Sequence, residues 1–132
     1  MKTYQLQTEA NASNTAAVLA FVENTLAGEH IPMKIIQRLL ICTDEIYANI
    51  AQYSQADSAE IKCMISETEV TLEFADNGIP YNPLENPEPD VTGTAEERNI
   101  GGYGIHIVKK FTNSIDYRYA DRKNVLSFSM VI

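Results

Sequence analysis

The chain has 132 residues, of which 45% are hydrophobic and 21% are charged, and its formal net charge is −8. This length fits one globular domain that buries an adequate core without disulfides or structural metals. Because duplex nucleic acids are polyanions, the acidic balance and the lack of any Lys/Arg cluster larger than two residues exclude a nucleic-acid-binding protein.

The first part of the sequence predicts one strand and two helices. Residues 2–8 are expected to form an edge strand. A helix follows to about residue 27, because Asn11 or Ser13 can cap its start and Gly28 can end it. Pro32 marks the first turn of a second helix, whose apolar residues recur at helical spacing to about residue 53. This helix is long and strongly apolar, so we expect it at the centre of the domain.

The rest of the sequence predicts a sheet and one more helix. Apolar and polar residues alternate over 59–65 and 70–74, which is typical of strands in a sheet with one face open to solvent. A helix is expected over 101–112, and two last strands over 115–119 and 125–132. Since strands and helices are segregated and no internal repeat is present, we predict a single α+β domain, 1–132, built as a two-layer sandwich.

Neither a membrane span nor a cysteine metal site is expected. The sequence contains no apolar run of the roughly 18–20 residues that a spanning helix needs, and its first residues lack a signal-peptide core. We therefore expect a cytoplasmic protein that does not engage a membrane. Cys42 and Cys63 lie in no CxxC pattern and no His is spaced to join them, so two buried reduced thiols are expected.

The first candidate site is a pair of polar residues on the central helix. Glu45 and Asn49 are four residues apart and therefore share one helical face. A carboxylate can accept a proton or orient a hydroxyl, and an amide oxygen is a good Mg²⁺ ligand beside phosphate oxygens and water. The alternative is that both side chains simply point to solvent, because this spacing is common.

The second candidate site follows the strand that ends near residue 74. In Asp76-Asn77-Gly78-Ile79-Pro80, the Asp76 carboxylate can accept a hydrogen bond from an exocyclic amine. Gly78 lets a flat ring approach the backbone closely. The alternative is a plain Asn-Gly turn.

The third candidate site is the glycine-rich segment Gly101-Gly102-Tyr103-Gly104-Ile105 at the start of a helix. Glycines before a helix expose N–H groups at its positive end, which suits a phosphate. The segment is neither a Walker A loop, since no GxxxxGK[ST] occurs, nor a dinucleotide-binding fingerprint. The alternative is a hinge or a close-packing device. Together, the three sites could serve the base, the metal and the phosphates of one nucleotide.

In this combination the chain resembles the GHKL ATPase superfamily and, within it, the anti-sigma-factor serine kinases, also called switch-protein kinases. The resemblance covers nearly the whole chain. Its motifs are an N box from Glu45 to Asn49, a G1 box over 76–80, a G2 box over 101–105, the segments Pro80-Tyr81-Asn82-Pro83 and Glu96-Glu97-Arg98, and a last hairpin around 117–126. It implies a Bergerat-type ATP-binding fold, with a mixed, mostly antiparallel sheet, helices on one face and residues 77–100 as an ATP lid.

The resemblance also implies roles for the base and metal contacts. Asn49 would hold Mg²⁺, and Glu45 would act as the base or orienter for the attacking hydroxyl. Asp76 would accept from the adenine amine, with Gly78 beside the ring. Ser127 would place a hydroxyl near adenine.

For the phosphates, the resemblance implies that backbone amides of the G2 box wrap them. These amides would come from Gly101, Gly102, Gly104 and Ile105. Arg98 would neutralise charge on the γ-phosphate, or would form a salt bridge on the lid surface.

The activity implied by the resemblance is transfer of phosphate from Mg-ATP to a serine of a STAS-domain antagonist, together with sequestration of a sigma factor by a homodimer. The chain departs from the family at Tyr53, where His is frequent, and at Asn82, where Asp is usual, which leaves the partner and the rate open. The alternatives are a non-catalytic module that switches a protein interface with nucleotide, a fragment related to ATPases or sensor kinases, and a structural domain without a ligand.

Overall fold

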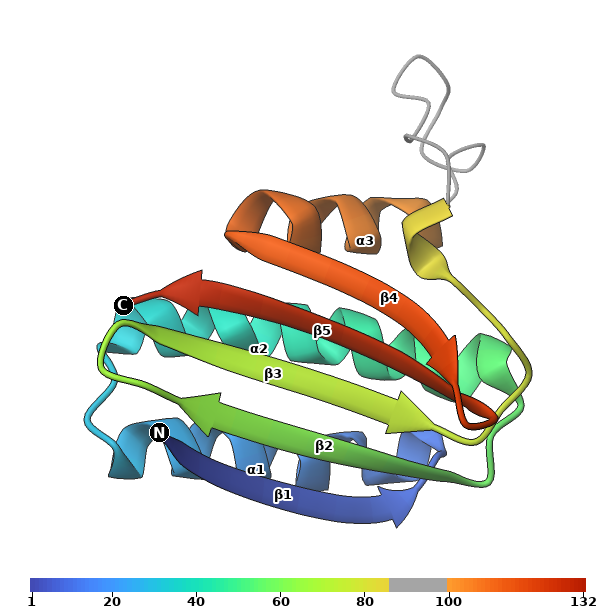
Figure 1. Cartoon of the computed structure of the whole chain (residues 1–132), viewed down its shortest axis with the longest axis horizontal. Coiled ribbons are helices and arrows are strands. Elements are labelled where there is room, and N and C mark those ends of the chain that lie inside the picture. The colour runs from blue at the N-terminus through green and yellow to red at the C-terminus, as the bar shows by residue number, and fades with distance from the viewer. Residues whose placement is uncertain (86–99) are drawn as a thin grey trace.

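Five strands form one sheet, and three helices cover one of its faces (Figure 1). The computed structural model describes residues 1–85 and 100–132, and only the backbone of 100–103. Short helical turns over Ala12–Asn14, Ile50–Ser54 and Pro83–Glu85 accompany the main elements. These are β1 (Lys2–Glu9), α1 (Thr15–Gly28), α2 (Met33–Asn49), β2 (Ser58–Ile65), β3 (Glu69–Asp76), α3 (Ile100–Phe111), β4 (Ser114–Ala120) and β5 (Lys123–Val131).

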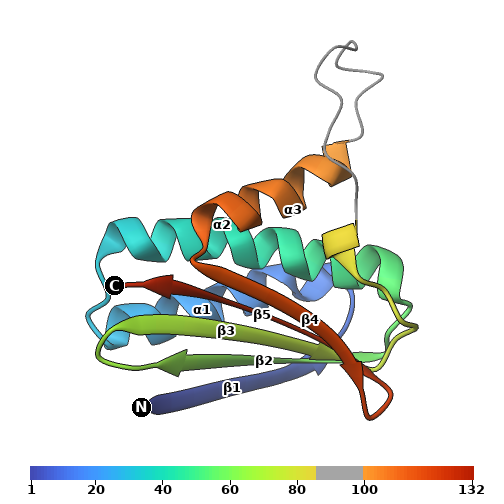
Figure 2. The same ribbon diagram turned by 45° about the horizontal axis from the view of Figure 1, so that its top comes forward.

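The strand order is β1-β2-β3-β5-β4, and every neighbouring pair is antiparallel. The predicted α+β sandwich with helices on one face is therefore confirmed, while the part of the sheet that the structure describes is antiparallel throughout rather than mixed. Figure 2 shows the three helices in one layer on one side of the sheet, and no described helix covers the other face. The register places Asp76, at the end of β3, opposite Asn124, at the start of β5.

The core lies between the sheet and the helices. Along β2 and β3 every second residue is buried, as the alternation in the sequence predicts. Helix α2 lies behind β3 and β5 in the middle of the molecule and buries Ile36, Leu39 and Ile46, which confirms its central place (Figure 1). A buried aliphatic side chain of this kind contributes about 1.5–3 kcal/mol of transfer free energy.

The end of α2 departs from the expected helix. The α-helix stops at Asn49, and the chain continues in one wider, π-helical turn over Ile50–Ser54. Gln55 then takes a left-handed conformation, with φ of 57°. This turn brings Ser54 to the edge of the sheet, beside the segment that follows β3.

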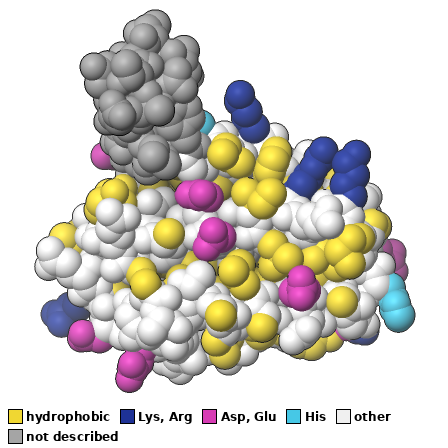
Figure 3. Space-filling view, turned by 180° about the vertical axis from the view of Figure 1, so that it is seen from behind, with side chains coloured by type: hydrophobic (Ala, Val, Ile, Leu, Met, Phe, Trp, Pro, Cys, Tyr) yellow, Lys and Arg dark blue, Asp and Glu magenta, His cyan; other side chains and the backbone are white. Residues whose placement is uncertain are grey.

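On the helical face, apolar side chains and carboxylates are interspersed (Figure 3). A shallow groove between α1 and α2 is lined by Leu19, Leu40 and Ile41, with Glu23 and Asp44 at its edge. None of the helices that the structure describes is long and apolar enough to cross a membrane.

Candidate functional site

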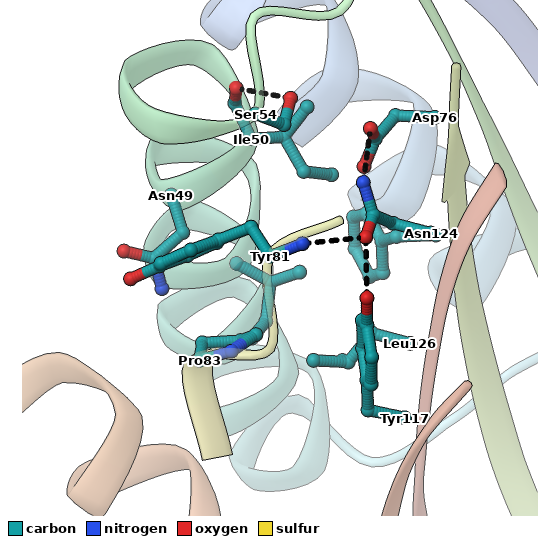
Figure 4. Close-up of a pocket in the computed structure, with 11 residues that line it drawn as sticks. Asn49, Ile50, Ser54, Asp76, Tyr81, Pro83, Tyr117, Asn124 and Leu126 are labelled. Atoms are coloured by element: carbon teal, nitrogen blue, oxygen red, sulfur yellow. Dashed lines mark hydrogen bonds between the residues drawn. The ribbon is translucent and has the colours of Figure 1, made fainter. Parts of the chain in front are cut away.

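A pocket lies at the end of the sheet where β3 ends, β5 begins and α2 passes behind them. Its apolar wall consists of Ile46, Ile50, Phe74 and Leu126, and Pro83 and polar side chains line the rest (Figure 4). These polar side chains are Asn49, Ser54, Asp76, Tyr81, Tyr117 and Asn124. The enclosed space of about 20 Å³ is room for roughly one water molecule.

Asp76 is the last residue of β3 and is only 3% exposed. Its Oδ1 accepts two hydrogen bonds, from the backbone N–H of Gly78 at 2.9 Å and from Nδ2 of Asn124 at 3.0 Å. Both of these bonds involve the same oxygen, so Oδ2 remains available as an acceptor. Two donors on one oxygen also hold the carboxylate in a fixed orientation.

Gly78 is required by a close contact rather than by an unusual φ. A Cβ atom here would lie 2.7 Å from the carbonyl carbon of Ser54 and 2.9 Å from Oδ1 of Asp76. The next residue, Ile79, donates its backbone N–H to the Ser54 carbonyl at 2.7 Å. The loop after β3 is thus held tightly against the end of α2. Gly78 makes this close approach to the backbone of Ser54, and its place beside a ring stays a prediction.

Asn77 does more than a residue in a plain turn. Its Oδ1 accepts the backbone N–H groups of Asp57 at 2.9 Å and Ser58 at 3.1 Å. The side chain therefore fixes the start of β2 next to the end of β3, which gives the pocket a rigid edge.

Glu45 and Asn49 occupy one face of α2, and neither is simply directed to solvent. Burial raises the pKa of the Glu45 carboxyl above its usual range, and the nearby charge of Asp44 raises it further. Asn49 is 8% exposed, and its Nδ2 has no hydrogen-bond partner among the described residues. An unpaired buried donor costs about 1–3 kcal/mol, so this amide is suited to a ligand that supplies the missing contact.

Gly104 packs directly against Glu45. A Cβ atom at position 104 would lie 2.7 Å from the carboxyl carbon of Glu45. This contact joins the second turn of α3 to the functional face of α2. Ile105 is fully buried in the core, so its side chain is not available to a ligand.

The glycines of the G2 box lie inside α3 rather than before it, because the helix begins at Ile100. The first four N–H groups of a helix lack an intrahelical acceptor, so the backbone of Gly101 and Gly102 fits a phosphate contact. Arg98, and most of the expected lid over 77–100, lie outside the described residues.

Ser127 is not part of this pocket, which corrects the sequence-based assignment. It pairs with Glu73 and Asp116, on the face of the sheet that points away from the helices. The pocket face of β5 carries Asn124 and Leu126 instead. The alternation of Leu126, Phe128 and Met130 in the sequence already contained this information, because odd positions of the strand must then face outward.

Tyr81 forms one wall of the pocket, and Tyr53 packs against its ring from outside. The rings of Tyr53 and Tyr81 lie 5.2 Å apart between centroids, at 34° to one another. Figure 4 shows Tyr81 between Asn49 of α2 and Asn124 of β5, to whose Oδ1 it donates its backbone N–H at 2.9 Å. The enclosed space is smaller than a purine ring, so the pocket has to widen before such a ring can enter. Tyr53, the departure from the family pattern, supports this ring from outside.

The chain is similar to known proteins over almost its whole length. Residues 8–130 match the family described as the histidine kinase-like ATPase domain. The chain belongs to this family. Over 97% of its length it is 25% identical to the serine/threonine-protein kinase BtrW of Bordetella bronchiseptica, of which 93% is covered.

A solved structure shows the same fold. The chain aligns over 98% of its length with the crystal structure of the RsbU and RsbW domains of Rv1364c from Mycobacterium tuberculosis, with a TM-score of 0.70 and 9% identity. It spans 32% of that chain. These findings confirm the resemblance to the GHKL superfamily and to its anti-sigma-factor kinases. An ATPase domain of this kind implies binding of ATP.

Proposed function

We propose that this histidine kinase-like ATPase domain is a protein serine kinase that binds Mg-ATP in the pocket between α2 and the end of β3. The observation that carries the proposal is the buried amide of Asn49, whose Nδ2 is unpartnered within the described residues, at the same pocket as the available Oδ2 of Asp76. The relative named as a serine/threonine-protein kinase supports the choice of reaction.

Each polar group of the site has a distinct task in this proposal. Oδ2 of Asp76 accepts a hydrogen bond from the amine of adenine. The amide oxygen of Asn49 would hold Mg²⁺, while its unpartnered Nδ2 donates to a phosphate oxygen. When bound, the metal ion neutralises charge on the phosphates. The backbone N–H groups of Gly101 and Gly102, at the positive end of α3, bind the phosphate oxygens.

Glu45 serves the attacking hydroxyl. Its carboxylate accepts the proton of the serine hydroxyl as that oxygen bonds to the γ-phosphorus and the bond to the β-phosphate oxygen breaks, releasing ADP. Burial helps, because a raised carboxyl pKa makes Glu45 a better proton acceptor than an exposed glutamate. The contact with Gly104 keeps the Glu45 side chain from moving further toward α3.

Nucleotide binding is the first test. Calorimetry of ADP and ATP with and without Mg²⁺ is expected to show micromolar or tighter affinity for the wild type, about 8 kcal/mol or more. Asn49→Ala is expected to lose the Mg²⁺-dependent part, while Asn24→Ala, at an exposed position of α1, retains it. A wild-type chain that binds neither nucleotide would refute the proposed site.

Phosphotransfer is the second test. The proposed substrate is a STAS-domain antagonist, and the proposed second partner is a sigma factor that a homodimer of this chain sequesters. Glu45→Ala is expected to bind ADP normally and to lose transfer of labelled phosphate to the STAS protein. Transfer at the wild-type rate by this variant would remove Glu45 from its role. Tight nucleotide binding with no transfer by the wild type would favour a non-catalytic, nucleotide-gated binding module.

A further inference from the structure

Asn124 is the most highly connected polar side chain of the pocket. It is the second residue of β5, and only 4% of it is exposed. Its Nδ2 donates to Oδ1 of Asp76 at 3.0 Å and to the backbone carbonyl of Ile79 at 2.7 Å. Its Oδ1 accepts the backbone N–H of Tyr81 at 2.9 Å and the hydroxyl of Tyr117 at 2.5 Å. Figure 4 shows Asn124 between Asp76 and Tyr117.

The partners of Asn124 fix the orientation of its amide. A backbone N–H can only donate, so Oδ1 must face Tyr81, and a backbone carbonyl can only accept, so Nδ2 must face Ile79. Both hydrogens of Nδ2 and both lone pairs of Oδ1 are then used. Asn124 has no capacity left for a ligand, although it lines the pocket.

The effect of this arrangement falls on Asp76. With Gly78, Asn124 saturates one carboxylate oxygen and keeps the carboxylate plane from rotating. Oδ2 is thereby held as a pure acceptor in a site with almost no room for water to rearrange. A purine with an amine at position 6 supplies a donor to this oxygen, whereas a purine with a carbonyl there brings a second acceptor against a carboxylate.

We propose that Asn124 is a positioning residue that gives the nucleotide site its selectivity for 6-amino over 6-oxo purines. It acts through Asp76 and does not touch the base. This inference rests on the proposed function, since it assumes that a purine nucleotide occupies the pocket. Tyr117 takes part in it, because its hydroxyl holds the oxygen of Asn124 and so extends the chain of hydrogen bonds from β3 across β5 to β4.

The test compares binding of ADP with binding of IDP, in which a carbonyl replaces the 6-amine. A hydrogen bond to a charged group corresponds to a preference of about 10- to 100-fold for ADP in the wild type. Asn124→Asp keeps the oxygen that accepts from Tyr81 and Tyr117 but turns the donor facing Asp76 into an acceptor. We expect this variant to bind ADP and IDP within about threefold of one another.

A pH series separates this role from a general structural one. In Asn124→Asp, two carboxyl groups face each other, and a shared proton restores a donor between them. Its affinity for ADP is therefore expected to rise more steeply than that of the wild type as the pH is lowered from 8 to 6. Loss of structural integrity alone would lower the affinity for ADP and IDP equally.

Tyr117→Phe provides a milder second variant, with Tyr119→Phe on the same strand as its control. Tyr119 is exposed, and its hydroxyl makes no hydrogen bond among the described residues, so its variant should keep the wild-type ratio of ADP affinity to IDP affinity. Tyr117→Phe should lower the ratio about two- to fivefold. If folded Asn124→Asp or Tyr117→Phe kept the wild-type ratio of ADP affinity to IDP affinity, the positioning role would be overturned and the proposed function would stand. A wild type that binds neither nucleotide would overturn the proposed function and this inference with it.

Discussion

Replacing Gly78 by alanine tests the tight packing at the edge of the pocket. The added methyl group would meet the Ser54 carbonyl and Oδ1 of Asp76, each closer than any real Cβ contact. Both neighbours are held, since Ser54 accepts the backbone N–H of Ile79 at 2.7 Å and Oδ1 accepts two hydrogen bonds. The backbone itself must therefore move.

The cost of this substitution follows from two contributions. Overpacking in a rigid site costs about 1–3 kcal/mol, and weakening the hydrogen bond between Ile79 and Ser54 costs about 1 kcal/mol more. For a domain of 132 residues, 1 kcal/mol shifts the melting temperature by about 3–4 °C. Gly78→Ala is thus expected to lower it by about 6–16 °C.

The matched control is Gly28→Ala at the end of α1. A Cβ atom at position 28 would meet nothing within 4 Å, so this variant should be unchanged or more stable by up to about 1 kcal/mol. Differential scanning calorimetry and urea titration of both variants measure the difference directly. If Gly78→Ala melted within 2 °C (about 0.5 kcal/mol) of Gly28→Ala, the loop after β3 would have room to relax and the argument from close contact would be wrong.

Three further predictions concern single side chains. Burial raises the folded-state pKa of Glu45 above its ordinary value of 4.5, so the stability that its protonated form provides is lost as the pH rises through the window above 4.5. The unfolding free energy of Glu45→Gln should accordingly rise relative to that of the wild type as the pH is raised from 4 to 8. A difference between the two proteins that stayed constant over this range in urea titrations would contradict this. Tyr47→Phe removes a hydroxyl that donates to the backbone carbonyls of Glu9 and Asn11, and should cost about 1 kcal/mol in the same titrations. Burial raises the pKa of Cys42 and of Cys63 to about 12, so neither thiol should react with a thiol reagent at pH 8 until urea unfolds the chain.

The fold was largely predictable because its signals are local. The period of α2 and the alternation of β2 and β3 depend on residues that are neighbours in the sequence. The end of α2 was less accessible, since the wider turn over Ile50–Ser54 is stabilised by the loop after β3, to which Ser54 offers its carbonyl. No local pattern announces that contact.

For the candidate site too, residues in local motifs could be predicted, whereas those that depend on long-range pairing could not. Glu45, Asn49 and Asp76 were identified from short motifs, and the structure brings Asn49 and Asp76 to one pocket. Asn124 was missed because its importance arises from the register between β3 and β5, a property of two strands that are distant in the chain. Ser127 was assigned to the pocket wrongly. It lies an odd number of residues from Asn124 and Leu126, and an odd offset places a side chain on the opposite face of a sheet.

Gly104 and Glu45 are far apart in the sequence but in contact in the structure, so the size of one side chain affects the space left for the other. Among relatives, a residue larger than glycine at position 104 would displace the carboxyl of a glutamate at position 45 from the place it has here, so the two positions are expected to change together. Since Glu45 is the proposed base, a lineage that acquired a larger residue at position 104 would also be expected to have given up phosphotransfer. The residue at position 104 of α3 would then distinguish relatives that retain phosphotransfer from those that retain only nucleotide binding.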